Sequence, residues 1–193
     1  QQNIDLWNAR YASKFSRWGT ARLLQGDSRE LMPAGDFAAA VSSPPWEDGV
    51  PQRGKVFRMP HDSTGNARGG YGNTHGNIGN ATGNTFWAAS KTILEQTYAA
   101  MRPGAHAIWV CKAYVRKGKL VDFPGQWQAL CEAVGFRTVC VHRAWLIEHH
   151  GTQHDINGNR HEWQTSHKSF FRHLCESKGS PPIDFETVIC MEK

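Results

Sequence analysis

The chain has 193 residues, of which 22 are Lys or Arg, 17 are Asp or Glu and 39% are hydrophobic. This length and composition fit a globular domain that buries a core, and they exclude a fibrous, collagen-like or disulfide-stapled miniprotein. The net charge of +5 favours a polyanionic partner such as nucleic acid, although net charge is first of all an argument about solubility.

The N-terminal residues place Ile4, Trp7 and Tyr11 at helical spacing, which predicts an amphipathic helix that begins without a cap. The sequence has no initiator Met, and we therefore hypothesise that the chain is the C-terminal portion of a longer protein. Two short apolar runs follow, at 21–24 and 37–41, and each ends in turn residues. Runs of this kind predict strands buried in a parallel sheet, with polar residues at their carboxyl ends.

Helices and strands alternate through the rest of the chain. The predicted elements are a helix at 85–101 that stops at an Arg-Pro-Gly turn, a strand at 105–111, a helix at 124–134, a strand at 136–147, a short helix at 169–177 and a final strand at 185–191. This alternation predicts an α/β fold with a mostly parallel sheet, in which the last pair of strands can run antiparallel.

Five cysteines are present, and none forms a CxxC pair: Cys111, Cys131, Cys140, Cys175 and Cys190. Most lie within apolar runs, which predicts reduced core thiols of a cytoplasmic protein. No stretch approaches the roughly 20 apolar residues that span a bilayer, so no membrane partner is expected. Histidines gather between 149 and 167 without the Cys or paired-His spacing of zinc sites, and no metal is predicted.

The most informative tetrapeptide is Ser43-Pro44-Pro45-Trp46, which follows the predicted strand at 37–41. Two consecutive prolines fix φ and lack an N–H, so the turn is rigid. Because α/β enzymes build active sites at the carboxyl edge of a parallel sheet, this turn is a candidate catalytic site. The Ser43 hydroxyl and the Pro44 carbonyl can accept hydrogen bonds from an amino group, and Trp46 offers a face on which a base can stack. The alternative is an ordinary Pro-Pro turn with a surface tryptophan.

This tetrapeptide resembles the catalytic motif of the DNA amino-methyltransferases, which is Asp, Asn or Ser followed by Pro-Pro and an aromatic residue. The resemblance implies S-adenosylmethionine as cofactor, duplex DNA as partner with the target base flipped out, and a phage or restriction-modification setting. It implies that the exocyclic amine donates to the Ser43 side chain and the Pro44 carbonyl while Trp46 stacks on the ring. The methyl group is then attacked directly, without a covalent enzyme intermediate.

The same resemblance implies a Gly-Asp element ahead of the catalytic motif, with its acidic residue beside the adenine of the cofactor. Gly26-Asp27-Ser28 matches this element, so Asp27 and Ser28 are the implied cofactor-binding residues. The alternative for Asp27 is a turn or a helix N-cap. The glycine-rich cofactor loop of the family has no match before Gly26 and none within 143–193. The implied fold is a Rossmann-like class I methyltransferase sheet flanked by helices but missing its first two strands, with 1–193 as the C-terminal part of one catalytic domain.

The serine at the first position of the motif favours cytosine N4 as the target in this family, whereas aspartate is more typical of adenine N6. Cytosine C5 methylation is not expected, because it needs a nucleophilic Cys, usually in a Pro-Cys pair, and no Cys here follows a Pro. Two alternatives remain open. One is an adenine-N6 methyltransferase acting on DNA or RNA, and the other is a non-catalytic nucleic-acid-binding remnant.

Nine of the 19 glycines fall within 47–84, a segment without predicted secondary structure. A loop of this length is usually functional or disordered. Directly after the catalytic turn, it is placed to close over a flipped base and to contact phosphates through its backbone and its four basic residues. Those candidate nucleic-acid contacts are Arg53, Lys55, Arg58 and Arg68. The alternative is a solvated insertion.

Two further polar segments are expected at the surface. The polar loop at 148–168 is expected to be solvated or to form a small target-recognition element that touches DNA. The densest basic run, at 112–119, is expected to be solvated, with phosphate contact as the alternative.

Overall fold

A computed structural model of the chain describes residues 2–12, 14, 21–24, 26–30, 35–47, 76–166, 173 and 176–193. The chain divides into two compact units, Gln1–Met32 and Pro33–Lys193. None of the helices in the described part combines the length and the apolar character that crossing a membrane requires.

The first unit contains helix α1, Gln2–Trp7, which continues as one wider turn, η1, over Asn8–Ala12. The predicted N-terminal helix is thus confirmed. The predicted strand at 21–24 is wrong, because these residues are exposed coil. In place of a strand partner, the Asn8 side chain bonds both the N–H and the carbonyl of Ala21, at 2.8 Å each.

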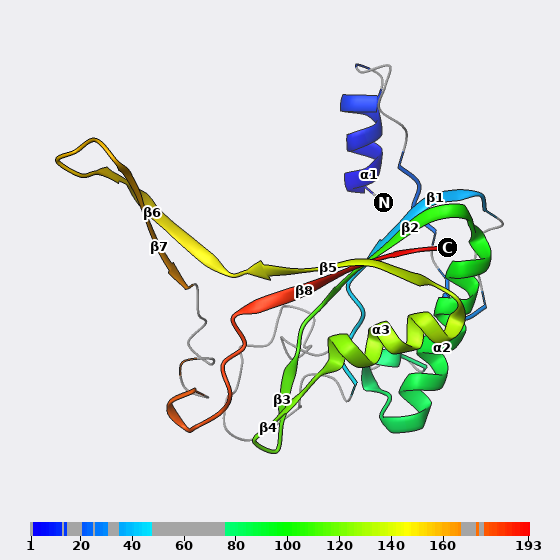
Figure 1. Cartoon of the computed structure of the whole chain (residues 1–193). Coiled ribbons are helices and arrows are strands. Elements are labelled where there is room, and N and C mark those ends of the chain that lie inside the picture. The colour runs from blue at the N-terminus through cyan, green and yellow to red at the C-terminus, as the bar shows by residue number, and fades with distance from the viewer. Residues whose placement is uncertain are drawn as a thin grey trace. The chain divides into compact units, whose positions relative to one another are not determined.

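The second unit is built on a four-stranded mixed sheet in the order β1-β2-β8-β5 (Figure 1). The strands are β1 at Phe37–Ser42, β2 at Met101–Cys111, β5 at Arg137–Trp145 and β8 at Phe185–Glu192. β1 and β2 are parallel, and β8 is antiparallel to both β2 and β5. The fold is therefore mixed α/β, and the expected antiparallel pairing of the last two strands of the sheet is confirmed.

Strand β1 was expected to be buried, and this is wrong. It lies at one edge of the sheet, pairs with β2 alone among the described residues, and has only Ala40 partly buried. An edge strand lacks a neighbour on one side, so its apolar side chains keep access to solvent. Val41 is 70% exposed.

Two helices cover one face of this sheet: α2 at Gly83–Ala100 and α3 at Phe123–Val134. They confirm the helices predicted at 85–101 and 124–134, with small shifts at their ends. Both ends of helix α3 are capped locally: the Asp122 side chain accepts the Gly125 N–H at the N-terminus, and Gly135 adopts φ 122° after the C-terminus.

Helix α2 ends at Ala100, just before the Arg-Pro-Gly sequence that predicted its end, and β2 begins at Met101. The residues of the expected turn lie in the first part of β2, where the pairing with β1 is bulged between Phe37 and Ala39. Gly104 adopts φ 75° here, and two backbone hydrogen bonds tie this part to the C-terminus: Gly104 N–H donates to the Lys193 carbonyl and Lys193 N–H to the Ala105 carbonyl, at 3.0 Å each. The Arg-Pro-Gly sequence thus follows the end of the helix as predicted, and it also forms an irregular start of β2.

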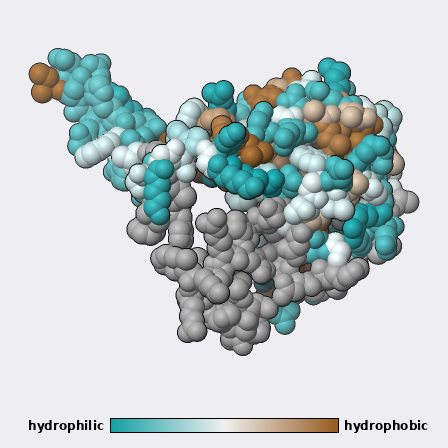
Figure 2. Space-filling view, turned by 90° about the horizontal axis from the view of Figure 1, so that it is seen from below, coloured by the Kyte–Doolittle hydropathy of each residue, from teal (hydrophilic) through white to brown (hydrophobic). Residues whose placement is uncertain are grey.

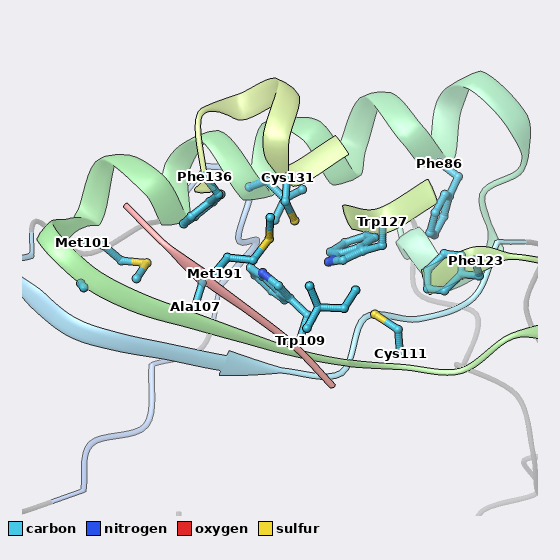
Figure 3. Packing of buried hydrophobic residues seen from close by; sticks show 13 residues of the cluster. Phe86, Met101, Ala107, Trp109, Cys111, Phe123, Trp127, Cys131, Phe136 and Met191 are labelled. Atoms are coloured by element: carbon cyan, nitrogen blue, oxygen red, sulfur yellow. The ribbon is translucent and has the colours of Figure 1, made fainter. Parts of the chain in front are cut away.

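The core lies between the sheet and the two helices (Figure 3). Alternate residues of β2 and β8 point into it, as the pleat of a strand requires. The largest fully buried side chains include Phe86 and Leu94 from α2, Phe123 from α3, and Ile189 and Met191 from β8. The core thus fixes β2 and β8 against the helices and holds the carboxyl ends of β1 and β2 in place.

Two small antiparallel sheets complete the unit. One pairs β3, Tyr114–Arg116, with β4, Lys119–Val121, and the other pairs β6, Ile147–His154, with β7, Arg160–Ser166. The expected polar loop at 148–168 is therefore mostly a hairpin, and the strand predicted at 136–147 stops at Trp145. On the face seen in Figure 2 the hairpin is mostly hydrophilic apart from its tip, although Trp163 and Ile147 on its strands are also exposed.

The turn of the β6–β7 hairpin is organised by Asp155. Its carboxylate accepts the Asn159 side-chain and backbone N–H groups at 2.9 Å each and the Asn157 N–H at 2.8 Å. These hydrogen bonds, that of the Asn159 side chain above all, lower the pKa of Asp155 to about 2. The helix predicted at 169–177 falls largely outside the described residues.

Candidate active site at the carboxyl edge of the sheet

A cavity of about 530 Å³ opens where β1 and β2 end. Its volume is within the roughly 300–1,000 Å³ typical of small-molecule sites. The lining residues come from the two strand ends, from the start of β8 and from the segment that precedes α2: Ser43, Pro44, Pro45, Trp46, Asn77, Ile78, Val110, Cys111, Lys112 and Glu186. The structure thus brings all four residues of the sequence-predicted catalytic motif to one cavity, at the sheet edge where α/β proteins bind ligands.

Ser43 is held by a hydrogen bond to the neighbouring strand. Its hydroxyl donates to the Val110 carbonyl at 2.9 Å, and the residue is otherwise exposed. A hydroxyl has one hydrogen to donate and two lone pairs that accept. Since the hydrogen is directed to Val110, the oxygen presents acceptor capacity to a ligand in the cavity.

The prolines and Trp46 form the rest of this wall. Pro44 is buried, and Pro45 and Trp46 are half-buried. The Trp46 ring lies beside the ring of Tyr114, with centroids 6.3 Å apart and planes tilted by 39°. Trp46 is not a surface tryptophan on an ordinary turn, which was the alternative interpretation. It packs against the core cluster and also lines the cavity.

Glu47, which sequence analysis did not identify as a candidate, follows Trp46 and bonds to residues of α2 and β3. Its carboxylate accepts the N–H of Gly83, the first residue of α2, at 2.6 Å. The Arg116 guanidinium lies 3.6 Å from the same carboxylate oxygen and donates to the Glu47 backbone carbonyl at 3.1 Å. Arg116 also covers the Tyr114 ring, 5.3 Å from its centroid. A carboxylate at a helix N-terminus satisfies an otherwise unpaired N–H and complements the helix dipole.

Replacing Glu47 by alanine should therefore lower the free energy of unfolding by about 1–2 kcal/mol, as loss of a helix cap does. Glu47→Gln keeps an acceptor for Gly83 and should cost less. The control is Glu95→Ala, which removes an exposed pair with Lys91 within α2 and should change stability by less than about 0.5 kcal/mol. Urea denaturation measures all three, and an equal effect of Glu47→Ala and Glu95→Ala would contradict the capping role.

Opposite charges lie on the lining of the cavity. Lys112 Nζ and a Glu186 carboxylate oxygen are 4.0 Å apart, and both side chains are partly exposed. Lys112 follows the last residue of β2, and Glu186 is the second residue of the antiparallel β8, so both belong to the same sheet edge. Lys112 was predicted only as part of a basic run that is solvated or, alternatively, contacts phosphate, and Glu186 was not predicted at all.

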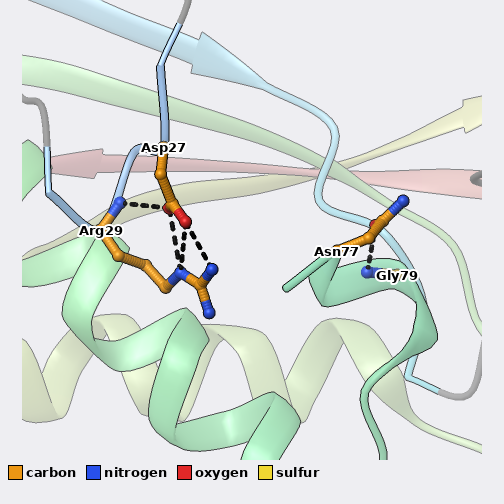
Figure 4. Close-up of polar contacts among 4 residues, drawn as sticks. All are labelled: Asp27, Arg29, Asn77 and Gly79. Carbon is orange, nitrogen blue, oxygen red and sulfur yellow. Dashed lines mark hydrogen bonds and ion pairs between the residues drawn. The ribbon is translucent and has the colours of Figure 1, made fainter. Parts of the chain in front are cut away.

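The end of the glycine-rich segment returns to the cavity. Ile78–Asn80 forms a short 3-10 helix, η2, and the Asn77 side chain accepts the Gly79 N–H at 3.0 Å (Figure 4). Asn77 and Ile78 line the cavity. The four predicted phosphate contacts of this segment lie outside the described residues: Arg53, Lys55, Arg58 and Arg68.

Asp27 and Ser28, the predicted cofactor contacts, belong to the first unit. The Asp27 carboxylate accepts the backbone N–H and the Nε–H of Arg29 at 2.9 Å each and forms an ion pair with the same guanidinium (Figure 4). The side-chain hydrogen bond from Arg29 is the main cause that lowers the pKa of Asp27 to about 2. Asp27 therefore has the geometry of a turn residue, which was the alternative to its predicted role in cofactor binding. Ser28, the next residue, is exposed.

Comparison with known proteins does not assign the chain to a family. No protein-family model matches the chain, and no curated protein sequence matches it at a significant level. The described part of the chain defines a mixed α/β fold with a partly apolar, partly charged cavity at the carboxyl ends of two parallel strands.

Proposed function

We propose that this chain supplies the base-binding wall of an S-adenosylmethionine-dependent DNA amino-methyltransferase, and that the base is cytosine modified at N4. The observation that supports it most is that Ser43, whose hydroxyl donates to the Val110 carbonyl and so keeps its oxygen as an acceptor, lines the same cavity as Trp46. An exocyclic amine needs hydrogen-bond acceptors, and a flipped base needs a flat apolar surface.

Each residue of the motif has a stated role in this proposal. The amine of the flipped base donates one hydrogen to Ser43 Oγ and one to the Pro44 carbonyl, which orients the nitrogen lone pair outward. Pro45 keeps the turn rigid because its φ is fixed. Trp46 stacks on the ring, and the roughly 1–3 kcal/mol of such stacking offsets much of the cost of flipping. Serine at the first position favours cytosine N4 through the family resemblance.

The described residues do not fit the cofactor. The Asp27 carboxylate is occupied by Arg29, and neither parallel strand leads into a glycine-rich turn: β1 leads into Ser43 and β2 into Lys112. S-adenosylmethionine supplies an electrophilic methyl group when it is bound, and the proposal assigns no described residue to holding it. The proposal therefore concerns how the target nucleobase is bound, and not how the cofactor is bound.

One expected result follows for the isolated chain. The 193 residues should bind S-adenosylmethionine more weakly than micromolar, because a glycine-rich loop and a free carboxylate are what such a nucleoside cofactor requires. Isothermal titration calorimetry measures this directly. A micromolar dissociation constant would overturn the prediction and would require a cofactor site that the described residues do not reveal.

Mass spectrometry of nucleosides tests the proposed function. DNA from cells that express the complete gene product should contain N4-methylcytosine that is absent from control cells. N6-methyladenine in its place would move the target to adenine. Absence of any methylated amine would favour the non-catalytic alternative.

A further inference from the structure

Three side chains with metal-binding chemistry meet on the sheet, away from the lining of the cavity. They are Cys140 and His142 of β5 and Cys190 of β8. Their two sulfur atoms and one ring nitrogen all lie within 4.8 Å of one another, and His142 Nε2 is 3.2 Å from Cys140 Sγ. In the sequence, Cys190 is 50 positions from Cys140, so spacing alone does not reveal the group.

The strand pairing explains why these three side chains meet. Residues i and i+2 of a strand point to the same face, which brings Cys140 and His142 together. Cys190 is the direct cross-strand partner of Cys140, so its side chain lies on that face as well. The neighbours of Cys190 along β8, Ile189 and Met191, point instead into the buried core against the helices. The group therefore lies on the sheet face opposite α2 and α3.

We propose that Cys140, His142 and Cys190 bind a zinc ion. With Zn–S of about 2.3 Å and Zn–N of about 2.0–2.1 Å, ligand atoms of a tetrahedral site lie about 3.5–3.8 Å apart. The separations in the structure reach this range with side-chain movements of about 1 Å, which rotation about χ1 and χ2 of partly exposed side chains supplies. Three protein ligands leave the fourth position to water, the arrangement of an accessible rather than a closed zinc site.

The donor set selects the class of metal. Two thiolates and one imidazole are soft or borderline ligands that favour zinc over magnesium or calcium, which require oxygen ligands. The nearest carboxylate on β8, Glu192, is two residues from Cys190 and is held by the Arg137 guanidinium at 2.6 Å. Binding forms two Zn–S bonds and one Zn–N bond, and the two thiol protons leave to solvent. The ion would join β5 to β8 by side chains in addition to their backbone ladder.

The two cysteines of this group differ in burial from the free cysteines of the core. Cys111 and Cys131 are buried, and desolvation raises the pKa of Cys111 to about 12. They behave as apolar packing groups that a metal ion does not reach. Cys140 and Cys190 are half-buried, so the sequence expectation of core thiols does not hold for these two.

Cobalt substitution tests the zinc site on the whole 193-residue chain kept under reducing conditions. One equivalent of Co²⁺ should give a thiolate-to-cobalt charge-transfer band and tetrahedral visible bands, and one equivalent of Zn²⁺ should remove them. Cys140→Ser, Cys190→Ser and His142→Ala should each weaken binding by more than the roughly 10–100-fold that loss of an outer-shell partner costs. His106→Ala is the matched control, because His106 is an exposed histidine on the adjacent strand β2 and is not in the group.

Each of three results would overturn the zinc site. One is cobalt binding that is unchanged in Cys140→Ser and Cys190→Ser, and another is absence of a charge-transfer band in a chain whose circular dichroism shows that it is folded. A disulfide between Cys140 and Cys190 that forms in air, with no metal bound after its reduction, counts equally against the proposal. His142→Ala keeps the test decisive if a cysteine variant fails to fold, since this side chain is exposed and its loss leaves the core intact.

Discussion

Methyl transfer by the complete gene product should be lost when Trp46 or Ser43 is replaced by alanine. Trp46→Ala removes the surface on which the flipped base stacks, worth roughly 1–3 kcal/mol, or about 5- to 150-fold in productive binding. Ser43→Ala removes an acceptor that orients the reacting amine. Loss of one positioned hydrogen-bonding group in an active site costs about 10²–10³ in rate. Transfer of a labelled methyl group from S-adenosylmethionine to DNA measures both variants.

Matched variants separate these effects from damage to the fold. Ser43→Ala also loses the hydrogen bond to the Val110 carbonyl, which contributes about 1 kcal/mol to stability. Ser42→Ala is the control, because Ser42 is exposed at the end of β1 and does not line the cavity. Trp46→Phe keeps an aromatic face and should retain part of the activity that Trp46→Ala loses. Full activity in both alanine variants would show that the motif is not part of the active site.

The largest expected effect on stability is that of Phe123→Ala. Phe123 is fully buried, and its ring centroid lies 5.8 Å from that of Trp127, 5.9 Å from that of Trp87 and 6.2 Å from those of Phe86 and Tyr114. Truncating a buried phenylalanine costs about 3–5 kcal/mol, because apolar contacts are lost and a cavity remains. Since Phe123 joins α3 to α2 and to Tyr114 of β3, the change also loosens the packing behind Trp46.

Leu120→Ala is the control for this prediction. Leu120 is 51% exposed on β4, three residues before Phe123, and its truncation should change the free energy of unfolding by about 0.5 kcal/mol or less. Urea unfolding followed by tryptophan fluorescence measures both variants. A loss below about 1 kcal/mol for Phe123→Ala would show that the cluster repacks without it, contrary to the packing described above.

The elements that the sequence predicted well have strong local signals. Helix α3 has a capping aspartate at Asp122, a proline in its first turn and a glycine after its last residue. Strand β8 contains three consecutive β-branched residues, Thr187 to Ile189, within a short apolar stretch, and this composition favours a strand. The motif at 43–46 was located because two prolines and a tryptophan after an apolar strand form an unusual combination. Each of these predictions depended on residues within a few positions of one another.

The elements that sequence reasoning missed depend on distant partners. The hairpin of β6 and β7 has polar, exposed strands, so no hydrophobic alternation marks it, and its pairing is visible only in the register. The run at 21–24 is as apolar as a strand but is exposed coil. Glu47 is bonded to Gly83 and to Arg116, which are 36 and 69 positions away in the sequence. No periodicity in a sequence indicates contacts between residues that far apart.

The central claim is that the turn at 43–46 binds a base amine for methylation. Mass spectrometry of nucleosides from DNA treated with the complete gene product and S-adenosylmethionine tests it most directly, with Ser43→Ala, Trp46→Ala and Ser42→Ala in parallel. The account predicts N4-methylcytosine from the unaltered protein and from Ser42→Ala, with a loss of about 5- to 150-fold in Trp46→Ala and of about 10²–10³ in Ser43→Ala. Undiminished methylation by Ser43→Ala and Trp46→Ala would contradict it.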